Sequence, residues 1–349
     1  MLSLSADKLD AFFETIATKA PLYLPVDTTD GKADFQRWTK GTKLSSALKT
    51  TRSAKDFFFP KTEHLVNLKM VGKHVTVEDP RKEVEDFVVF GVRACDAASF
   101  KIVDDVYLNM TPVDTYYKNR RDHGTIITLA CTEPAQTCFC KAYGIDAAEP
   151  AGDVSAWLAD GVYYFKPVTE RGQKFSDSVQ SQLAKSDDKA VEAQQKAIRE
   201  KCASTPFASL DLSKWKGKDM LKIFNSSIWS DLSQTCLGCG TCTYICPTCM
   251  CFDIRDFDTG NGVKQFRCWD SCMYSDFTQM AAANPRLSQK ERFRQRFMHK
   301  LIYYPMAHND NFQCVGCGRC LDSCPIHMNI VKVIKAYNEQ EQDNDGGKA

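Results

Sequence analysis

Two runs of four cysteines carry the clearest chemical meaning in this sequence. The first run lies at residues 236–247 with the spacing C-x2-C-x2-C-x3-C-P, and residues 314–325 repeat that spacing. Three thiolates within seven residues can bind one iron–sulfur cube, because a tight loop points all three inward. Two glycines in each run permit positive φ angles and let backbone N–H groups approach the cluster sulfides. Each run therefore predicts one [4Fe–4S] cluster.

The fourth cysteine of each run is assigned to the cluster of the other run, as it is in two-cluster ferredoxins. The proline that follows it turns the chain away from the cluster. Structural zinc is the alternative, but zinc sites use two well-separated pairs of ligands, and three cysteines in seven residues crowd a tetrahedron. The predicted ligands of cluster A are Cys236, Cys239, Cys242 and Cys324. The predicted ligands of cluster B are Cys314, Cys317, Cys320 and Cys246.

A third group of cysteines follows two apolar runs in the first half of the chain, at residues 86–92 and 124–130. Both runs are typical of buried strands, and strands that each end in a cysteine-bearing loop suggest a site at one edge of a sheet. The local spacing C-x6-C-x-C fits no common ferredoxin, yet four thiolates gathered there suffice for one cluster; scattered buried thiols are the alternative. Arg93 and Asp96 flank the first of these cysteines, either to tune a cluster or as a surface ion pair. The candidate ligands of this cluster C are Cys95, Cys131, Cys138 and Cys140.

Five cysteines remain outside these groups, and two of their spacings resemble other motifs. Cys249 completes the C-x3-C-x2-C spacing of radical S-adenosylmethionine enzymes, but its two partners belong to the first run and only 100 residues follow, too few for a barrel. Cys268 and Cys272 match half of a sirohaem site, without the upstream pair. Cys249 and Cys251 alternate along a predicted strand with Cys268 across from them, so a further metal site stays open there, although buried thiols are the favoured interpretation. Nothing is assigned to Cys202.

The elements that position these cysteines divide the chain into two predicted domains. Residues 1–205 are a mixed α/β domain that carries cluster C, and residues 206–337 are a mainly helical ferredoxin-type domain that carries clusters A and B. The acidic tail at 338–349 is expected to fray. The predicted fold class is therefore α+β. Hydrophobic patterns predict helices at 5–19, 96–108 and 176–201 (the last a polar, solvated one), strands at 86–92, 124–130 and 161–165, and a hairpin of 250–257 with 263–269.

Residues 285–304 predict a basic helix in the second domain. Its Phe293, Phe297 and Leu301 lie at the spacing of a core-facing stripe. Its basic side chains are interpreted either as a docking face or, by default, as a solvated surface. These basic residues are Arg286, Lys290, Arg292, Arg294, Arg296 and Lys300.

Composition excludes several classes of protein. The chain has 349 residues, 45 Lys+Arg against 44 Asp+Glu, and a net charge of +1, which gives no reason to expect nucleic acid or anionic lipid as a partner. It contains no run of 18 apolar residues that could span a membrane and no export signal. Its 17 cysteines are better explained by metal ligation in the cytoplasm than by disulfides. Neither a GxGxxG nor a Walker sequence is present, so no nucleotide or flavin site is predicted.

The order of these motifs resembles a known family. The chain resembles the iron–sulfur β subunit of sulfhydrogenases, the corresponding iron–sulfur subunit of anaerobic sulfite reductase, and flavin oxidoreductase subunits linked to heterodisulfide reductase. The segments that carry this resemblance are, in order, GVRACD, ITLACTEPAQTCFC, CLGCGTCTYICPTCMCFDI and CVGCGRCLDSCPIH. RSAKDFFFPKTE at 52–63 belongs to the same likeness, which covers nearly the whole chain. The resemblance implies a third [4Fe–4S] cluster at the four cysteines of cluster C. It also implies a partner subunit that holds FAD and oxidises NAD(P)H.

These observations predict an iron–sulfur electron-transfer subunit of a hetero-oligomer. It would relay single electrons between the FAD/NAD(P)H flavoprotein subunit and a terminal subunit of hydrogenase, sulfite reductase or heterodisulfide reductase type. Two alternatives stay open. One is an iron–sulfur enzyme in its own right, which would need an open coordination position. The other is a metal-stabilised structural or binding subunit.

Overall fold

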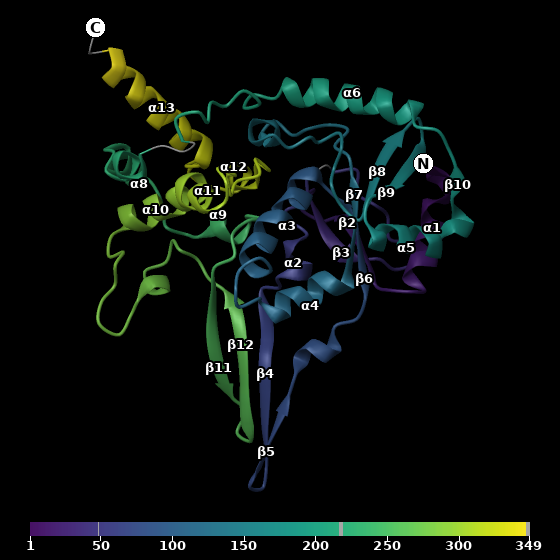
Figure 1. The fold of residues 1–349 in the computed structure, drawn as a ribbon, viewed down its shortest axis with the longest axis horizontal. Coiled ribbons are helices and arrows are strands. Elements are labelled where there is room, and N and C mark those ends of the chain that lie inside the picture. Colours follow the sequence, from purple (N-terminus) through teal and green to yellow (C-terminus); the bar gives the residue numbers. More distant parts are fainter. Residues whose placement is uncertain (48, 216–218, 347–349) are drawn as a thin grey trace.

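A mixed eight-stranded sheet organises the N-terminal half of the chain (Figure 1). The computed structural model describes residues 1–47, 49–215 and 219–346. The strand order is β10-β1-β9-β8-β7-β6-β2-β3, and the central strands β2, β6, β7 and β8 run parallel. The strands are β1 (Leu2–Ser5), β2 (Leu22–Asp27), β3 (Ala33–Arg37), β6 (Phe87–Val92), β7 (Gly124–Leu129), β8 (Val154–Ala159), β9 (Val162–Pro167) and β10 (Ala184–Lys185).

Continuous apolar sequence forms the central strands because helices cover both faces of the sheet. Alternate residues of β6 enter two different cores: Val88 and Phe90 pack with the residues of α1 (Leu9–Ala17), whereas Phe87 and Val89 pack with those of α3 (Ala94–Tyr107). The three strands predicted from the sequence are present, each within two residues of its predicted ends. Because β6 and β7 are parallel neighbours, the loops that follow them leave the same edge of the sheet.

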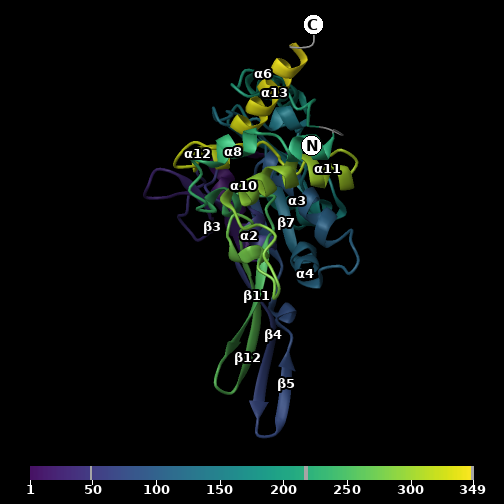
Figure 2. The ribbon, with the colours of Figure 1, turned by 90° about the vertical axis from the view of Figure 1, so that its left-hand side faces the viewer.

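A second, four-stranded sheet projects from the body as an arm (Figures 1 and 2). The predicted hairpin is present as β11 (Phe252–Asp258) and β12 (Gly262–Trp269). The sequence did not predict that β12 also pairs with β4 (Thr62–Val71), which in turn pairs with β5 (His74–Glu78). The arm therefore joins strands from both predicted domains, and the boundary at residue 205 stays a prediction.

Helices form the C-terminal half around a core of aromatic and aliphatic side chains. The predicted stripe of α10 (Gln289–Met298) and the π-helical turn after it is buried: Phe293, Phe297 and Leu301 are at most 2% exposed. Within the described ranges, no helix is long and apolar enough to cross a membrane. The other helices of the fold are α2 (Lys55–Phe58), α4 (Thr115–His123), α5 (Glu170–Ser178), α6 (Lys189–Ala203), α7 (Met220–Phe224), α8 (Ile228–Ser233), α9 (Thr241–Tyr244), α11 (Tyr304–Ala307), α12 (Arg319–Asp322) and α13 (Ile330–Gly346).

Two segments differ from their predicted form. The polar stretch at 176–201 is not one solvated helix, because it contains the end of α5, the short strand β10 and most of α6. Helix α6 packs against the sheet through buried Val191, Ile198 and Cys202. The C-terminal helix α13 runs to Gly346, into the segment expected to fray, and residues 347–349 lie outside the described residues.

Candidate metal centres

The four cysteines predicted for cluster A line one cavity, between the first run, the segment after the second run and α10. The Gln289 Nε2 donates to Cys236 Sγ at 3.4 Å, and the backbone N–H of Met328 donates to Cys324 Sγ at 3.2 Å. Gly240 has a φ of 74°, and a Cβ there would lie 2.6 Å from the Tyr274 hydroxyl, so only glycine fits. N–H donors aimed at the sulfurs and a tight glycine loop suit a bound iron–sulfur cube.

The cluster B cysteines lie close enough to influence one another electrostatically. Burial raises the pKa of Cys314 to about 11, and the neighbouring sulfurs of Cys320 and Cys246 act in the same direction. Burial likewise raises the pKa of Cys317 and of Cys320, with Cys246 contributing to both. Buried thiols resist deprotonation unless a positive group compensates, and a bound iron–sulfur cluster supplies that compensation.

The cluster C cysteines also line a single cavity, although their sequence spacing is irregular. Cys95 comes from the start of α3 after β6, and the other three come from the loop that follows β7. A fifth cysteine, Cys202 of α6, lines the same cavity and is 8% exposed. Sequence reasoning missed Cys202, because nothing in its local pattern indicates that α6 folds back over the cluster C loop.

The second cysteine run packs directly on the cluster C loop. The Phe139 N–H donates to the Gly316 carbonyl at 2.8 Å. A Cβ at Gly316 would lie 2.5 Å from the Phe139 backbone, and one at Gly318 would lie 2.3 Å from the Thr137 carbonyl oxygen. Glycine is required at both positions, because it allows the two backbones to approach closely and because it adopts the positive φ angles of 60° and 76° found there. Cys317 itself lines the cluster C cavity.

The three cysteine groups follow one another in series. Burial raises the pKa of Cys242 in group A, and the nearby Cys320 of group B raises it further. Burial likewise raises the pKa of Cys95 in group C, and Cys317 of group B acts in the same direction. Group B thus lies between the other two. The structure gathers each predicted set on its own, and the ligand assignments themselves remain predictions.

Buried cations face these sulfurs, which corrects the interpretation of the basic helix. Arg296 and Lys300 are 4% and 3% exposed, so they belong neither to a docking face nor to a solvated surface. Burial disfavours the charge on Lys300, but the sulfurs of Cys246, Cys249 and Cys314 outweigh it and hold the lysine pKa above its usual value. The ammonium group donates to Thr248 Oγ1 at 2.9 Å. A second buried lysine, Lys55, donates to the carbonyls of Cys249 at 2.7 Å and Cys246 at 3.1 Å.

Asp96 is also inside the protein, so the surface ion pair considered for it is wrong. Its carboxylate is 1% exposed and accepts two hydrogen bonds, at 2.5 and 2.7 Å, from the Arg319 guanidinium between the cysteines of the second run. Arg319 also donates to the Thr50 carbonyl at 2.9 Å. Arg93 is 9% exposed and donates to the carbonyls of Leu129 and Ala130. The Asp96–Arg319 pair ties group C to group B.

We expect the Lys300→Met variant to shift one cluster to a more negative reduction potential, by on the order of tens of millivolts. The lysine contributes a buried positive charge beside Cys246 and Cys314, and its loss makes the addition of an electron less favourable. A redox titration followed by electron paramagnetic resonance measures the shift. The exposed Lys290→Met on the same helix is the control, and equal potentials in both variants would contradict this role.

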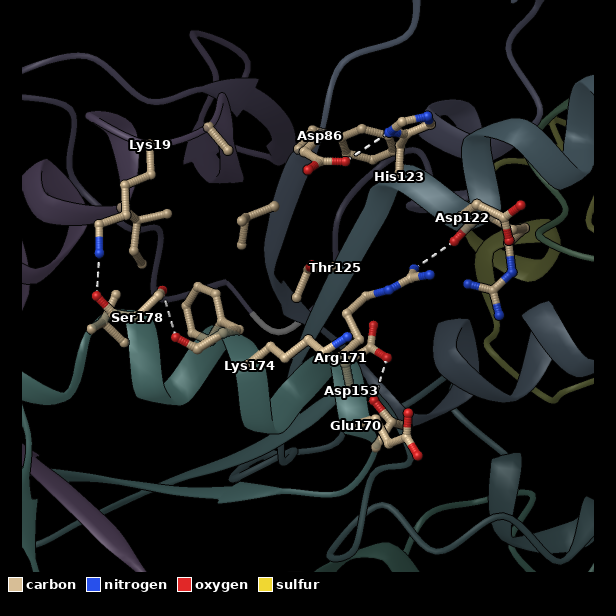
Figure 3. A pocket seen from close by; sticks show the side chains of 18 of the residues that line it. Lys19, Asp86, Asp122, His123, Thr125, Asp153, Glu170, Arg171, Lys174 and Ser178 are labelled. Carbon is tan, nitrogen blue, oxygen red and sulfur yellow. Dashed lines mark hydrogen bonds and ion pairs between the residues drawn. The ribbon is translucent and has the colours of Figure 1, made fainter.

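A cavity without any cysteine lies where strands β6 and β7 begin. Figure 3 shows the side chains that line it. It measures about 900 Å³, and several of the charged side chains that line it have partners. His123 Nδ1 lies 2.7 Å from Asp86, and the Thr169 hydroxyl donates to Asp153 at 2.7 Å. Arg171 donates to the carbonyl of Gly124 at 2.6 Å. Nothing in this cavity points to the chemistry of the cysteines.

Comparison with known proteins agrees with the cysteine geometry. Residues 235–328 match the family described as a 4Fe-4S dicluster domain. The chain is 34% identical over 264 residues to the sulfhydrogenase 2 subunit beta of Pyrococcus furiosus, an alignment that covers 72% of this chain and 74% of that subunit. The chain belongs to the sulfhydrogenase β-subunit family. No solved structure matches it.

As a member of the sulfhydrogenase β-subunit family with a dicluster domain, the protein is an iron–sulfur electron-transfer subunit of an oxidoreductase and carries [4Fe–4S] clusters. The matched range contains all eight cysteines predicted for clusters A and B. The cluster C cysteines lie outside it. Among the described residues, no three His, Cys, Asp or Glu side chains converge on a point that could hold one metal ion; the cysteines surround cavities instead.

Proposed function

We propose that the chain is a three-cluster relay. It would pass single electrons between a FAD-containing NAD(P)H-oxidising flavoprotein subunit and a terminal subunit of hydrogenase, sulfite reductase or heterodisulfide reductase type. The observation that carries this proposal is the serial arrangement of three four-cysteine groups, with group B in contact with group C through the backbones of Phe139 and Gly316.

The roles of the residues follow from their surroundings. Cysteines of groups A, B and C would hold the three clusters, and each cluster, when bound, gains and loses one electron at a time. Lys300, Arg296 and Arg319 supply buried positive charge, which offsets the charge of the thiolates. The close approach of the second run to the backbone of the cluster C loop would hold the clusters of groups B and C next to each other.

A partner subunit is required on both sides of such a relay. The sequence has no Gly-rich nucleotide loop, so the flavin and its reductant would belong to another chain. The Pyrococcus furiosus relative is by name one subunit of a sulfhydrogenase, which supports a hetero-oligomer.

Group A is the end of the relay that is nearest to solvent. Cys239 is the one exposed cysteine of the 17, all of which lie in the described ranges. Leu237 beside it is 66% exposed, and Leu287 on the segment before α10 is 79% exposed. Gln289 contacts both Cys236 and Gly238, which brings that segment next to the first run. A redox partner with an apolar contact surface would dock here.

Anaerobic purification of the chain with its natural partners tests the proposal. We expect about twelve irons per chain, a visible absorption that dithionite bleaches, and a co-purifying flavoprotein whose reduction by NADH or NADPH bleaches the clusters. A colourless chain loaded with zinc would instead indicate a structural module. A chain that turns over a substrate without any partner would indicate an enzyme in its own right.

A further inference from the structure

Strand β5 forms one open edge of the arm. It is the last strand in the order β11-β12-β4-β5, so β4 is its one neighbour among the described strands, and it lies on the outside of the arm (Figure 2). Val75 and Val77 of β5 are 59% and 66% exposed, and Met70, which pairs with Val75 across β4, is 57% exposed. An edge strand that exposes apolar side chains is a template for pairing with another strand.

The turn before β5 determines which of its backbone groups face outward. Val71 pairs with His74 across the two-residue loop Gly72–Lys73, whose glycine has a positive φ of 63°. A tight turn of this kind closes with a hydrogen bond between the residues that flank it, so the backbone groups of His74 point towards β4. Because this direction alternates along an antiparallel strand, the N–H and C=O groups of Val75 and Val77 point away from β4. These four groups are open to a second strand.

The sequence of this edge is complementary to its own reverse. Residues 73–79 read KHVTVED, with a lysine and a histidine at the start and a glutamate and an aspartate at the end. When two copies pair antiparallel about Thr76, Val75 of each copy lies opposite Val77 of the other. The outward-facing backbone groups of these valines then meet and form four hydrogen bonds. This register therefore satisfies the open edge of both copies.

The same register also matches the charges. It places Lys73 of one copy opposite Asp79 of the other, and His74 opposite Glu78. Cross-strand pairs of opposite charge stabilise an antiparallel sheet, and like charges destabilise it. Each of these carboxylates has one cationic partner within its own chain, at 2.7 Å. A carboxylate accepts several hydrogen bonds, so both can also receive a donor from the second copy.

Neighbouring registers lose this match. Pairing about Val75 would place Lys73 opposite Val77, and pairing about Val77 would place Val75 opposite Asp79. Each of these registers faces a charge with an apolar side chain. Pro80 follows directly and has no N–H group to donate, so the pairing ends there. One register is thus selected over the others, which is unusual for a short exposed strand.

We propose that the arm joins two copies of this chain through antiparallel pairing of β5 with β5, about a twofold axis at Thr76. The two four-stranded sheets then form one continuous sheet of eight strands. Met70, Val75 and Val77 of both copies share one face of it, because residues paired across two strands lie on the same face. The contact lies at the end of the arm, away from α9 and α12, which carry cysteines of groups A and B (Figure 1).

Anaerobic analytical ultracentrifugation of the intact chain with its clusters tests the contact. The wild type should be a dimer in reversible equilibrium with its monomer. Two variants should dimerise at least about 10-fold more weakly, because each places like charges opposite one another. The acidic variant is Lys73→Glu with His74→Glu, and the basic variant is Glu78→Lys with Asp79→Lys. An equimolar mixture of the two should dimerise again, which would also show that neither variant is misfolded.

The matched control reverses two exposed charges on other strands of the arm. Arg255→Glu with Lys264→Glu changes the net charge in the same direction as the acidic variant and should dimerise like the wild type. A wild-type chain that stays monomeric would overturn the inference, and so would a mixture of the acidic and basic variants without dimers. If the variants detach another subunit from the purified complex while the chain alone is a monomer, β5 pairs with that subunit and the inference is wrong.

Carbodiimide cross-linking and mass spectrometry give an independent readout of the register. Lys73 and Asp79 of one strand lie about 20 Å apart, too far for a direct amide bond, because a strand rises about 3.3 Å per residue. A mixture of ¹⁵N-labelled and unlabelled chains should therefore yield a peptide that joins Lys73 of one kind of chain to Asp79 of the other. The Lys69–Glu78 pair, at 2.7 Å within one chain, is the positive control. If this pair cross-links and the mixed peptide is absent, the proposed register is wrong.

Discussion

Replacement of Cys320 by alanine should remove about four of the roughly twelve irons and slow electron transfer from the reduced flavoprotein partner to the terminal acceptor by at least about 100-fold. Cys320 is a proposed ligand of cluster B, and group B lies between groups A and C. The loss of cluster B would therefore interrupt electron transfer between groups A and C. Iron analysis and stopped-flow bleaching of the clusters measure the two effects.

The control for this prediction is Cys268→Ala, because Cys268 lies on strand β12 outside all three groups. That variant should keep its iron and its rate of electron transfer. Full turnover of the complex with Cys320→Ala would show that electrons bypass group B, and the relay would be wrong. Loss of iron in both variants would instead indicate general unfolding.

A second large effect is expected when Arg319 is replaced by methionine. Its partner Asp96 is 1% exposed, so the substitution leaves a carboxylate buried without its cation. Breaking a buried ion pair on one side costs about 3–5 kcal/mol of the free energy of unfolding. Urea unfolding of the chain with its clusters, under anaerobic conditions, measures that loss.

Two further variants separate the charge effect from the loss of packing. The double variant Arg319→Met with Asp96→Ala should recover part of the lost stability, since no unpaired charge remains buried. Arg199→Met breaks the exposed pair with Asp146 and should cost no more than about 1 kcal/mol. If Arg319→Met alone stays within about 1 kcal/mol of the wild type, the buried pair does not hold the two halves together.

The sequence predicted the parts of the site that depend on local spacing. Each cysteine run begins as a loop and continues into a short helix, α9 or α12, and the glycines of both runs have the positive φ angles that the pattern indicates. The strands before Cys95 and Cys131 were predicted because a strand buried on both faces is continuously apolar, and the structure adds that they pair in parallel.

Contacts between distant segments could not be predicted in this way. Pairing of β12 with β4 joins residues that lie between 193 and 206 positions apart, and neither strand carries a signal that identifies its partner. The polar composition of residues 176–201 concealed the few apolar side chains with which α6 covers the cluster C cavity. Arg296 and Lys300 looked like surface charges because spacing alone does not show which face of a helix meets thiolates.

The contact between the second cysteine run and the cluster C loop has a consequence for biosynthesis. Asp96 emerges from the ribosome 223 residues before Arg319, and Thr137 emerges 185 residues before its partner Asp322. Until those last residues are made, one wall of the cluster C cavity is missing and Cys95 and Cys131 stand open to oxidants. Clusters are therefore expected to be inserted after synthesis of the chain has ended, and the cluster C cavity is expected to close last.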